Sequence, residues 1–381
     1  MVRVAVVSKT FVAEASQQVL ERIAAHPGVE LTLITPPEWR SDDGRTLPFV
    51  PRYTAGYAVR PTPVVFNGRY HFYIYRGLSR VMRQLQPDIV HIDEEPYNPA
   101  GAQAQRAALV VGARTIFVAL QNLYKDYPFP YSAMEQYSYR HMAHMIAVNA
   151  AAGEVARRKG YAGPLSVFTV YGIDPDTFQP ALRREPRPAP DTFIIGYLGR
   201  LTLYKGTGLL IEALASMPAR FRLRFIGSGP DEPELRHLVA QHGVADRVEF
   251  RAAVPTDAVP AALAEVDALA VPSLTQANWM EQFGRVLIEA MACGTPVVGS
   301  DSGEIPNVIG DAGLIVPEGD VAALRDALLR LEADPALRAR LSQMGRERAL
   351  RLYTNDAAAR NVVAVYQQTL GAVLHAARPS S

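Results

Sequence analysis

The chain has 381 residues, 49% of them hydrophobic, and it carries 39 Lys and Arg against 38 Asp and Glu. This length suggests two or three domains, and the net charge of +1 gives no electrostatic reason to expect nucleic acid as a partner. The single cysteine, Cys293, excludes a disulfide framework, fits a reducing compartment and is expected to be a small buried residue.

The first residues favour a strand over a secretory signal peptide. Residues 2–7, VRVAVV, read as a strand and lack the long apolar core of a signal peptide. No apolar run approaches the roughly 18 residues that span a bilayer. We therefore expect a cytoplasmic chain that is at most peripheral on the inner face of a membrane.

The first elements predict an α/β fold with a doubly wound parallel sheet. The strand at 2–7 is followed by a helical pattern from about 15 to 25 and by a second strand at 31–35. Ligands gather at the carboxyl ends of strands in such sheets, so the residues directly after the first strand, including Lys9 and Thr10, are expected near a site.

Two polar clusters follow later strands of the first half. The strand in PDIVHIDEEPYNPA (87–100) ends at His91, Glu94 and Glu95, and the strand at 115–120 leads to Asn122, Tyr124 and Lys125. We expect the two clusters to face the same cleft. HMAH (141–144) places two histidines at i, i+3 of a predicted helix, but a third metal ligand is missing nearby, so core or solvated histidines are the better interpretation.

Residues 36–78 are rich in proline, arginine and aromatic side chains. Ordinary packing is one interpretation. The other is a surface that grips an acceptor sugar, a lipid head group or a membrane interface.

A segment rich in proline and arginine, residues 181–191, is predicted to link a first domain, 1–180, to a second, 192–355. Strands are predicted in the second domain at about 193–198, 221–226, 247–250, 268–271, 296–299 and 313–316. Gly199-Arg200 ends the first of these strands, and Lys205 precedes the next helix. Two cations at the mouth of a parallel sheet suit a diphosphate, because arginine offers a fork and lysine a point charge.

The segment from Pro272 to Ser300 reads as strand end, loop, helix and strand. Phe283-Gly284 opens the helix, whose free N–H groups suit a phosphate. Glu281 lies in the loop and Glu289 eight positions further on, where its carboxylate could accept hydrogen bonds from a diol such as ribose. An amphipathic helix with a surface glutamate at each end is the alternative.

These motifs together resemble glycosyltransferase family 4. The resemblance is carried by EQFGRVLIEAMACGTPVV, with glutamates at 281 and 289, by GYLGRLTLYKGTGLLIEAL (196–214) and by FRLRFIGSGPDEPEL (221–235). It covers essentially all of residues 190–370 and the N-terminal half more loosely. It implies a GT-B fold, in which two Rossmann-like domains face each other across a cleft, and a C-terminal helical segment, 356–381, that crosses back to the first domain.

The family resemblance also implies roles for individual residues. Arg200 and Lys205 would stabilise the leaving diphosphate, and Glu281 would contact the donor sugar or order the phosphate loop. The donor-binding set would be Gly199, Gly227, Gly229, Val254, Phe283, Gly284, Arg285 and Glu289. Acceptor or cleft residues would be Lys9, Thr10, His91, Glu94, Glu95, Asn122, Tyr124 and Lys125.

This chain departs from the family pattern at two places in the N-terminal half. Lys9 and Thr10 stand where the family often has a glycine-rich loop. The histidine that the family commonly carries near residues 121–122 is absent, so a histidine contact to the donor sugar cannot be carried over, and Asn122 can only hydrogen-bond a sugar hydroxyl.

The activity implied is retaining transfer from a nucleotide-diphosphate sugar, with UDP- or GDP-sugars expected, to a glycan, lipid-linked or small-molecule acceptor. Front-face attack would need neither a metal nor another cofactor. A GT-B sugar phosphorylase or epimerase, or a non-catalytic partner subunit, is the alternative. Peripheral membrane contact through residues 36–78 is a further expectation, whereas the base, sugar, acceptor, linkage and oligomeric state stay open.

Overall fold

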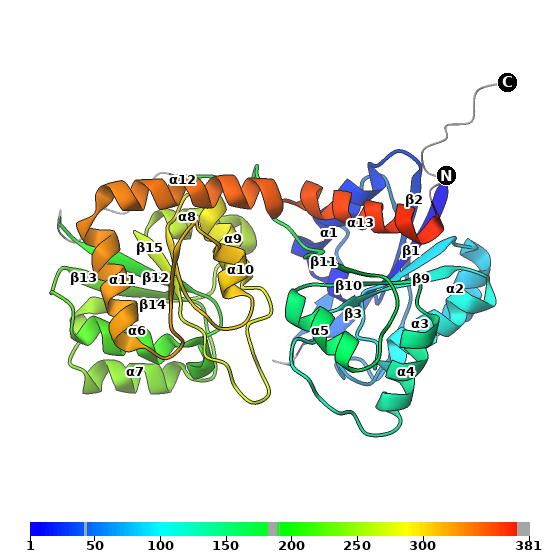
Figure 1. The fold of residues 1–381 in the computed structure, drawn as a ribbon, viewed down its shortest axis with the longest axis horizontal. Coiled ribbons are helices and arrows are strands. Elements are labelled where there is room, and N and C mark those ends of the chain that lie inside the picture. Colours follow the sequence, from blue (N-terminus) through cyan, green and yellow to red (C-terminus); the bar gives the residue numbers. More distant parts are fainter. Residues whose placement is uncertain (42–43, 182–188, 190, 372–381) are drawn as a thin grey trace. The chain divides into compact units, whose positions relative to one another are not determined.

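The computed structural model describes residues 1–41, 44–181, 189 and 191–371, and the chain forms two compact units (Figure 1). The N-terminal unit comprises Met1–Gly172 and Asn355–Ser381, and the C-terminal unit comprises Ile173–Thr354. The N-terminal unit therefore ends at Gly172, eight residues before the boundary predicted at residue 180. Most of the predicted linker, residues 181–191, lies outside the described residues.

The strands of the N-terminal unit are β1 (Val2–Val7), β2 (Val29–Thr35), β3 (Glu38–Arg40), β4 (Thr46–Pro48), β5 (Ala58–Pro61), β6 (Val64–Val65), β7 (Ile74–Tyr75), β8 (Ile89–Ile92), β9 (Arg114–Ala119), β10 (His144–Ala147) and β11 (Leu165–Val167). Its helices are η1 (Thr10–Val12), α1 (Glu14–Ala24), α2 (Leu78–Leu85), α3 (Pro99–Val110), α4 (Tyr131–His141), α5 (Ala150–Arg158) and α13 (Asn355–Leu370).

The strands of the C-terminal unit are β12 (Phe193–Leu198), β13 (Phe221–Ile226), β14 (Val248–Arg251), β15 (Ala268–Val271), β16 (Val297–Ser300) and β17 (Leu314–Val316). Its helices are η2 (Leu203–Lys205), α6 (Thr207–Ala215), α7 (Glu232–Gln241), η3 (Ala245–Arg247), η4 (Thr256–Ala258), α8 (Val259–Ala264), α9 (Arg285–Ala292), α10 (Ile305–Ile309), α11 (Val321–Ala333) and α12 (Pro335–Leu352).

Each unit is built on one parallel sheet, which confirms the expected α/β class. Within the described residues, the N-terminal sheet has seven strands in the order β11-β10-β9-β8-β1-β2-β5, and the C-terminal sheet has six in the order β14-β13-β12-β15-β16-β17. The strand order reverses between β1 and β8 in the first sheet and between β12 and β15 in the second. Such switch points are where doubly wound sheets bind ligands, at the carboxyl ends of the strands.

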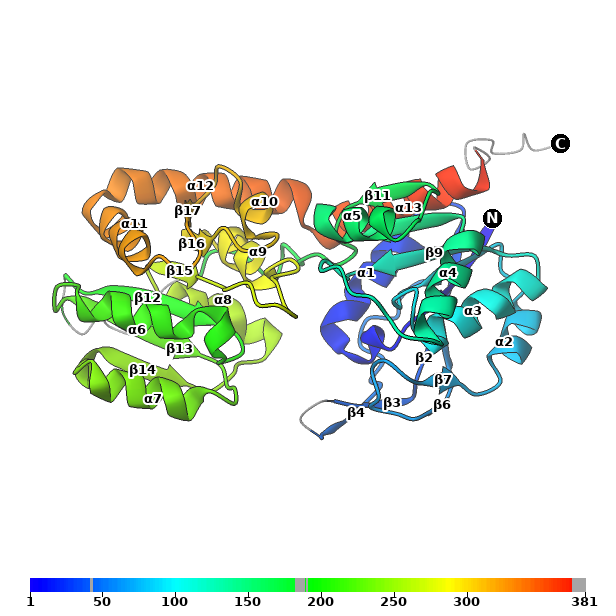
Figure 2. The same cartoon turned by 60° about the horizontal axis from the view of Figure 1, so that its bottom comes forward.

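The strands are apolar runs because helices cover both faces of a doubly wound sheet. In β1, Val4 and Val6 pack into one buried cluster, and Ala5 and Val7 pack into another. The first cluster also contains Tyr366 of α13, which packs beside α1 in the N-terminal unit (Figures 1 and 2).

One local expectation differs from the structure. His141 ends α4 and His144 begins β10, so the HMAH histidines do not share a helix. His144 is buried, and its Nε2 atom lies 3.0 Å from the Ser166 hydroxyl. The i, i+3 spacing of the histidines suggested one helix, but α4 ends at the first histidine and β10 begins at the second.

Candidate functional site

The first candidate site lies at the switch point of the C-terminal sheet. Gly199 and Arg200 follow β12, and Pro272 and Ser273 follow β15, which pairs with β12. The Tyr197 hydroxyl donates to the Arg200 carbonyl oxygen at 2.7 Å, which holds the backbone at this edge. We call this edge, with η2 and the start of α9, the C-terminal site.

Lys205 and Glu281 form a partly buried ion pair in the C-terminal site. The Lys205 Nζ atom lies 2.7 Å from a Glu281 carboxylate oxygen, which also accepts a 3.1 Å hydrogen bond from the Ser273 hydroxyl. The same Nζ lies 4.5 Å from the centre of the Trp279 ring. The ammonium is therefore held at the sheet edge by a carboxylate and an aromatic face.

The start of α9 supplies the second polar feature of the C-terminal site. Gly284 is the N-cap residue, with φ of 75°, which favours glycine. Arg285 is the first residue of α9, and its Nε donates to the carboxylate of Glu289, one turn further on, at 3.0 Å. Burial raises the pKa of the Glu289 carboxyl, and Arg285 opposes this shift. The start of α9, where a helix leaves N–H groups without partners inside the helix, is thus followed one turn later by a buried carboxylate paired with the partly exposed Arg285.

Close backbone packing fixes the loops after β12 and β13. A Cβ atom on Gly227, whose φ is 153°, would fall inside the Gly199 carbonyl group, and one on Gly229 would fall inside the Leu201 carbonyl group. These glycines therefore bring the two loops together. Val254 and Phe283 pack partly buried on one hydrophobic cluster of the unit.

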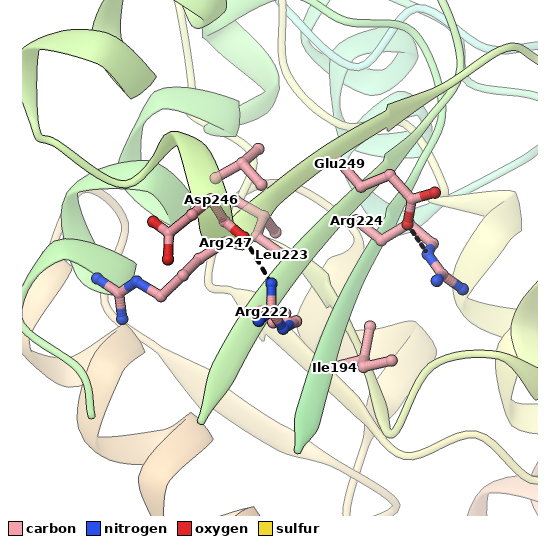
Figure 3. A pocket seen from close by; sticks show the side chains of 8 residues that line it. Ile194, Arg222, Leu223, Arg224, Asp246, Arg247 and Glu249 are labelled. Carbon is pink, nitrogen blue, oxygen red and sulfur yellow. Dashed lines mark hydrogen bonds and ion pairs between the residues drawn. The ribbon is translucent and has the colours of Figure 1, made fainter. Parts of the chain in front are cut away.

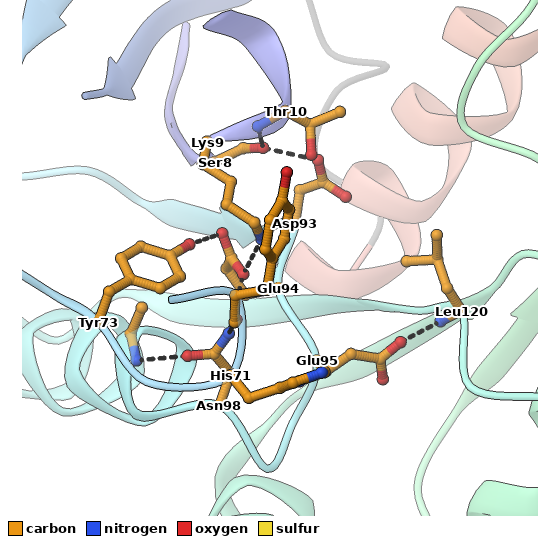
Figure 4. A network of polar contacts seen from close by, with 12 residues as sticks. Ser8, Lys9, Thr10, His71, Tyr73, Asp93, Glu94, Glu95, Asn98 and Leu120 are labelled. Carbon is orange, nitrogen blue, oxygen red and sulfur yellow. Dashed lines mark hydrogen bonds and ion pairs between the residues drawn. The ribbon is translucent and has the colours of Figure 1, made fainter. Parts of the chain in front are cut away.

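The second candidate site lies at the switch point of the N-terminal sheet, where residues after β1 and β8 meet (Figure 4). Lys9 Nζ donates to Glu94 at 2.8 Å, and the Asn98 amide donates to the same oxygen at 3.2 Å. The Tyr73 hydroxyl also donates to the Glu94 carboxylate. We call this group, with the parallel cluster on Asp93, the N-terminal network.

The Asp93 carboxylate is the second acceptor of the N-terminal network. It accepts from the Ser8 hydroxyl at 2.7 Å and from the Tyr171 hydroxyl at 2.5 Å. The Thr10 N–H in turn donates to the Ser8 hydroxyl at 2.9 Å. Ser8 and Asp93 are buried, so these hydrogen bonds connect the first turn after β1 to the end of β8 inside the unit.

Aromatic rings surround the Lys9 ammonium, which lies 5.3 to 5.8 Å from the ring centres of Trp39, Tyr70 and Tyr73. Burial lowers the pKa of Lys9, but Glu94 outweighs it, so the pKa is raised and the charge is kept. Burial likewise raises the pKa of Glu94, against the effect of Lys9. The sequence did not reveal these rings as partners of Lys9, because 30 or more positions separate them from it along the chain.

Glu95 connects the ends of β8 and β9. Its carboxylate accepts the Leu120 N–H at 2.9 Å. Burial raises the pKa of Glu95 to about 7, against the N–H groups of Leu120 and Gln121. Glu95 therefore joins the first polar cluster to the backbone at the end of β9, and Asn122 of the second cluster is buried two residues further on.

The remaining residues predicted for the acceptor site are His91, Tyr124 and Lys125. His91 is buried and its Nδ1 atom lies 2.8 Å from the Tyr366 hydroxyl of α13, and burial lowers the pKa of His91 to about 4. Tyr124 is 42% exposed and its ring lies 4.6 Å from the Arg158 guanidinium. Lys125 is half-buried on the same loop as Tyr124.

A separate cavity of about 200 Å³ lies at the amino ends of β12, β13 and β14 (Figure 3). Within it, Arg224 Nε donates to Glu249 at 2.7 Å, and Arg222 donates to the Asp246 carbonyl oxygen at 2.5 Å. This edge is opposite to the carboxyl ends that carry Gly199 and Gly227, so the cavity does not belong to the C-terminal site.

No group of three or more His, Cys, Asp or Glu side chains that could hold a metal ion occurs among the described residues. The Asp174 carboxylate instead caps a turn, accepting from the Asp176 N–H at 3.1 Å and the Thr177 hydroxyl at 3.0 Å. Cys293 is buried behind α9, and burial raises its pKa to about 12.

Two known protein families match this chain, one in each half of the sequence. Residues 178–348 match the family described as Glycosyl transferases group 1, and residues 17–176 match Glycosyltransferase Family 4. The chain belongs to glycosyltransferase family 4. The first match contains every residue of the C-terminal site, and the second contains Glu94 and Glu95 of the family's N-terminal domain.

Curated relatives are similar to this family 4 chain over part of their length. A GDP-mannose-dependent alpha-(1-6)-phosphatidylinositol monomannoside mannosyltransferase of Mycolicibacterium smegmatis is 35% identical over 191 residues, which are 47% of this chain and 50% of the relative. A D-inositol 3-phosphate glycosyltransferase of Xylanimonas cellulosilytica is 36% identical over 213 residues, 52% of this chain and 50% of the relative. The chain spans about half the length of the curated relatives it matches.

Solved structures share the fold over nearly the full chain. Sucrose-phosphate synthase from Thermosynechococcus elongatus has a TM-score of 0.72 at 22% identity, covering 97% of this chain and 99% of that one. HepE of Anabaena, solved in complex with UDP, has a TM-score of 0.70 at 17% identity and covers 97% and 100%. The two parallel-sheet units together have the GT-B fold.

Proposed function

We propose that the chain is a retaining glycosyltransferase that moves a sugar from a nucleoside-diphosphate donor to a hydroxyl acceptor. The observation that carries this proposal is the convergence of Lys205, Glu281 and the start of α9 at the switch point of the C-terminal sheet. Cations and free N–H groups there suit a diphosphate, and the buried Glu289 carboxylate suits the two hydroxyls of a ribose.

In the proposed reaction the acceptor oxygen bonds to the anomeric carbon while the bond from that carbon to the diphosphate oxygen breaks. The nucleoside diphosphate leaves with the electron pair and takes the acceptor proton, so attack comes from the leaving-group face and the configuration is retained. Arg200 and Lys205 stabilise the charge that develops on the diphosphate. Because these two cations would stabilise the diphosphate, the proposed reaction needs no metal ion, and metal independence is part of the proposal.

The names of the relatives guide the choice of substrates. A GDP-mannose donor and an acceptor that contains phosphorylated inositol are the first pair to test, because both occur among the curated relatives. UDP-sugars are the second choice, since HepE was solved with UDP. Lys9 and Glu94 of the N-terminal network, with the neighbouring Glu95, are the proposed acceptor residues, because the Lys9 ammonium can bind a phosphate and the carboxylates can accept hydrogen bonds from hydroxyls.

The first test is a thermal-shift panel with UDP, GDP, ADP, TDP, NAD and inorganic phosphate. A ligand at 100 times its dissociation constant stabilises the protein by about 2.7 kcal/mol, which is readily measured. The proposal predicts a shift with one nucleoside diphosphate that is lost in Glu289→Ala. A shift with phosphate alone would favour a sugar phosphorylase, and no shift with any ligand would favour a non-catalytic subunit.

A further inference from the structure

Residues 44–87 carry an unusual charge. They contain seven arginines and no lysine, aspartate or glutamate, in a chain whose formal net charge is +1. The segment therefore has a charge of +7, and subtracting this from +1 leaves −6 on the rest of the chain. A local excess of this size produces a positive surface even though the whole chain is balanced.

Five of these arginines have no carboxylate partner among the residues that the structure describes: Arg60, Arg69, Arg76, Arg80 and Arg83. All five are exposed. Their charge is consequently not neutralised within the described part of the fold and is available to an anionic partner.

Apolar side chains are exposed within the same segment. Around β7 the side chains alternate, so Tyr73 and Tyr75 are buried while Phe72 and Ile74 are 40% and 38% exposed. The outward face of a half-buried strand is normally polar. At β7 this outward face carries Phe72, Ile74 and then Arg76. The packing of the unit does not require exposed apolar side chains at these positions.

Phe66 is the second exposed aromatic residue of this surface. It is 52% exposed, and its ring centre lies 5.2 Å from that of Phe72. Its φ of 61° lies in the left-handed region, which is unfavourable for a bulky side chain. A residue that is both strained and exposed is not explained by stability, and such outliers cluster at functional surfaces.

The turn that carries Phe66 is fixed to β3. The Asn67 side chain accepts the Arg40 N–H at 2.9 Å and donates to the Glu38 carbonyl oxygen at 3.1 Å. β3, β4, β6 and β7 lie along one edge of the N-terminal unit, drawn at the bottom of that unit in Figure 2. Glu38 is an acidic residue at this edge, but Arg40 and Arg69 offset it locally.

We propose that Phe66, Arg69, Phe72, Ile74 and Arg76, the 66–76 surface, dock the N-terminal unit on an anionic lipid bilayer. Exposed aromatic and aliphatic groups enter the interface while arginines pair with lipid phosphates. A soluble polyanion would need the arginines but not the apolar groups, so a bilayer fits better. No described helix is long and apolar enough to cross a membrane, and the contact proposed is peripheral.

The test is flotation of the full chain with vesicles of phosphatidylcholine alone or with 30% phosphatidylglycerol, at about 0.1 M salt. We expect binding to the anionic vesicles only. Arg69→Gln/Arg76→Gln should weaken it by roughly 30-fold, since each arginine contributes about a factor of five near such a surface. Phe66→Ser/Phe72→Ser should weaken it by at least about tenfold through lost apolar burial.

Matched controls use exposed residues elsewhere in the N-terminal unit. Arg106→Gln/Arg140→Gln removes the same charge, and Val110→Ser removes an apolar side chain that is 70% exposed. Both should bind vesicles as the parent chain does. Circular dichroism and nucleoside-diphosphate binding, measured on every variant, report folding and the donor site independently.

Three results would overturn the docking proposal. The first is no binding to anionic vesicles, and the second is an equal loss of binding in the control variants. The third is that Phe66→Ser/Phe72→Ser binds anionic vesicles as the parent chain does and that heparin competes for this binding. The last would indicate a polyanion surface. The docking proposal goes beyond the donor chemistry and does not depend on it. A chain that floats with vesicles but binds no nucleotide would refute only the proposed transferase function.

Discussion

Replacing the buried Glu289 carboxylate by an amide separates ligand binding from stability. In the free chain this carboxylate is 7% exposed and contacts Arg285 at 3.0 Å. With a nucleotide bound, we expect it to accept hydrogen bonds from the ribose hydroxyls. Charge-assisted hydrogen bonds contribute about 1.5–3 kcal/mol each, and Glu289→Gln keeps one neutral acceptor oxygen.

The expected loss of binding free energy in Glu289→Gln is therefore about 1.4–2.8 kcal/mol, or 10- to 100-fold in Kd. Stability should change by less than about 1 kcal/mol, because an i, i+4 ion pair with a partly exposed arginine contributes only about 0.5 kcal/mol and the amide costs less to bury than the carboxylate. Isothermal titration with the preferred nucleoside diphosphate and urea unfolding measure the two quantities.

Glu332→Gln is the matched control for this variant. Glu332 forms an ion pair with Arg220 at 3.0 Å, and Arg220 directly precedes β13 at the amino edge of the same sheet. It should lose stability without losing nucleotide affinity. Parental affinity in Glu289→Gln, or an equal loss in Glu332→Gln, would refute the placement of the ribose.

The remaining predictions concern charge stabilisation, backbone packing and pH. Lys205→Met should lower kcat by about 10²-fold at saturating donor, because it removes the cation that we propose stabilises the leaving diphosphate; unchanged kcat would refute this role. Gly227→Ala should lower the free energy of unfolding by more than about 2 kcal/mol, whereas Gly243→Ala, at φ of 66° in open space, should cost about 1 kcal/mol; equal costs would contradict the clash. Burial raises the folded-state pKa of Glu95 to about 7, above the ordinary glutamate value of 4.5, so the folded chain binds more protons between these values and stability falls as pH rises through this window. Urea unfolding at pH 4.5 and at pH 7 measures how far the free energy of unfolding falls between the two. In Glu95→Gln this fall should be smaller than in the parent chain by on the order of 1–3 kcal/mol, and an unchanged fall would count against the buried carboxyl.

The sequence predicted the C-terminal sheet closely because each of its strands is an apolar run buried on both faces. The predicted strand at 193–198 corresponds to Phe193–Leu198, and the one at 268–271 corresponds to Ala268–Val271. Glycine and helix-start chemistry likewise indicated that α9 begins directly after Gly284. Local pattern was sufficient wherever the relevant contacts are close in sequence.

The N-terminal network could not be read in this way. The partners of Lys9 are Trp39, Tyr70, Tyr73 and Glu94, and only the folded sheet brings them together. Their spacing matches no helical or strand period. His91 illustrates the opposite case, because it was predicted for the cleft from its position near a strand end but its side chain contacts α13.

The most direct test of the central claim is a ³¹P NMR time course with GDP-mannose, UDP-glucose and their congeners, each with inositol phosphate and phosphatidylinositol vesicles as acceptors. We predict that one donor loses its diphosphate diester signals to a nucleoside diphosphate only when acceptor is present. Turnover should be at least about 10²-fold slower in Lys205→Met. Failure to consume any nucleotide sugar, or consumption at the parental rate in Lys205→Met, would contradict the assignment of this chain as a glycosyltransferase with its donor site at Lys205, Glu281 and Glu289.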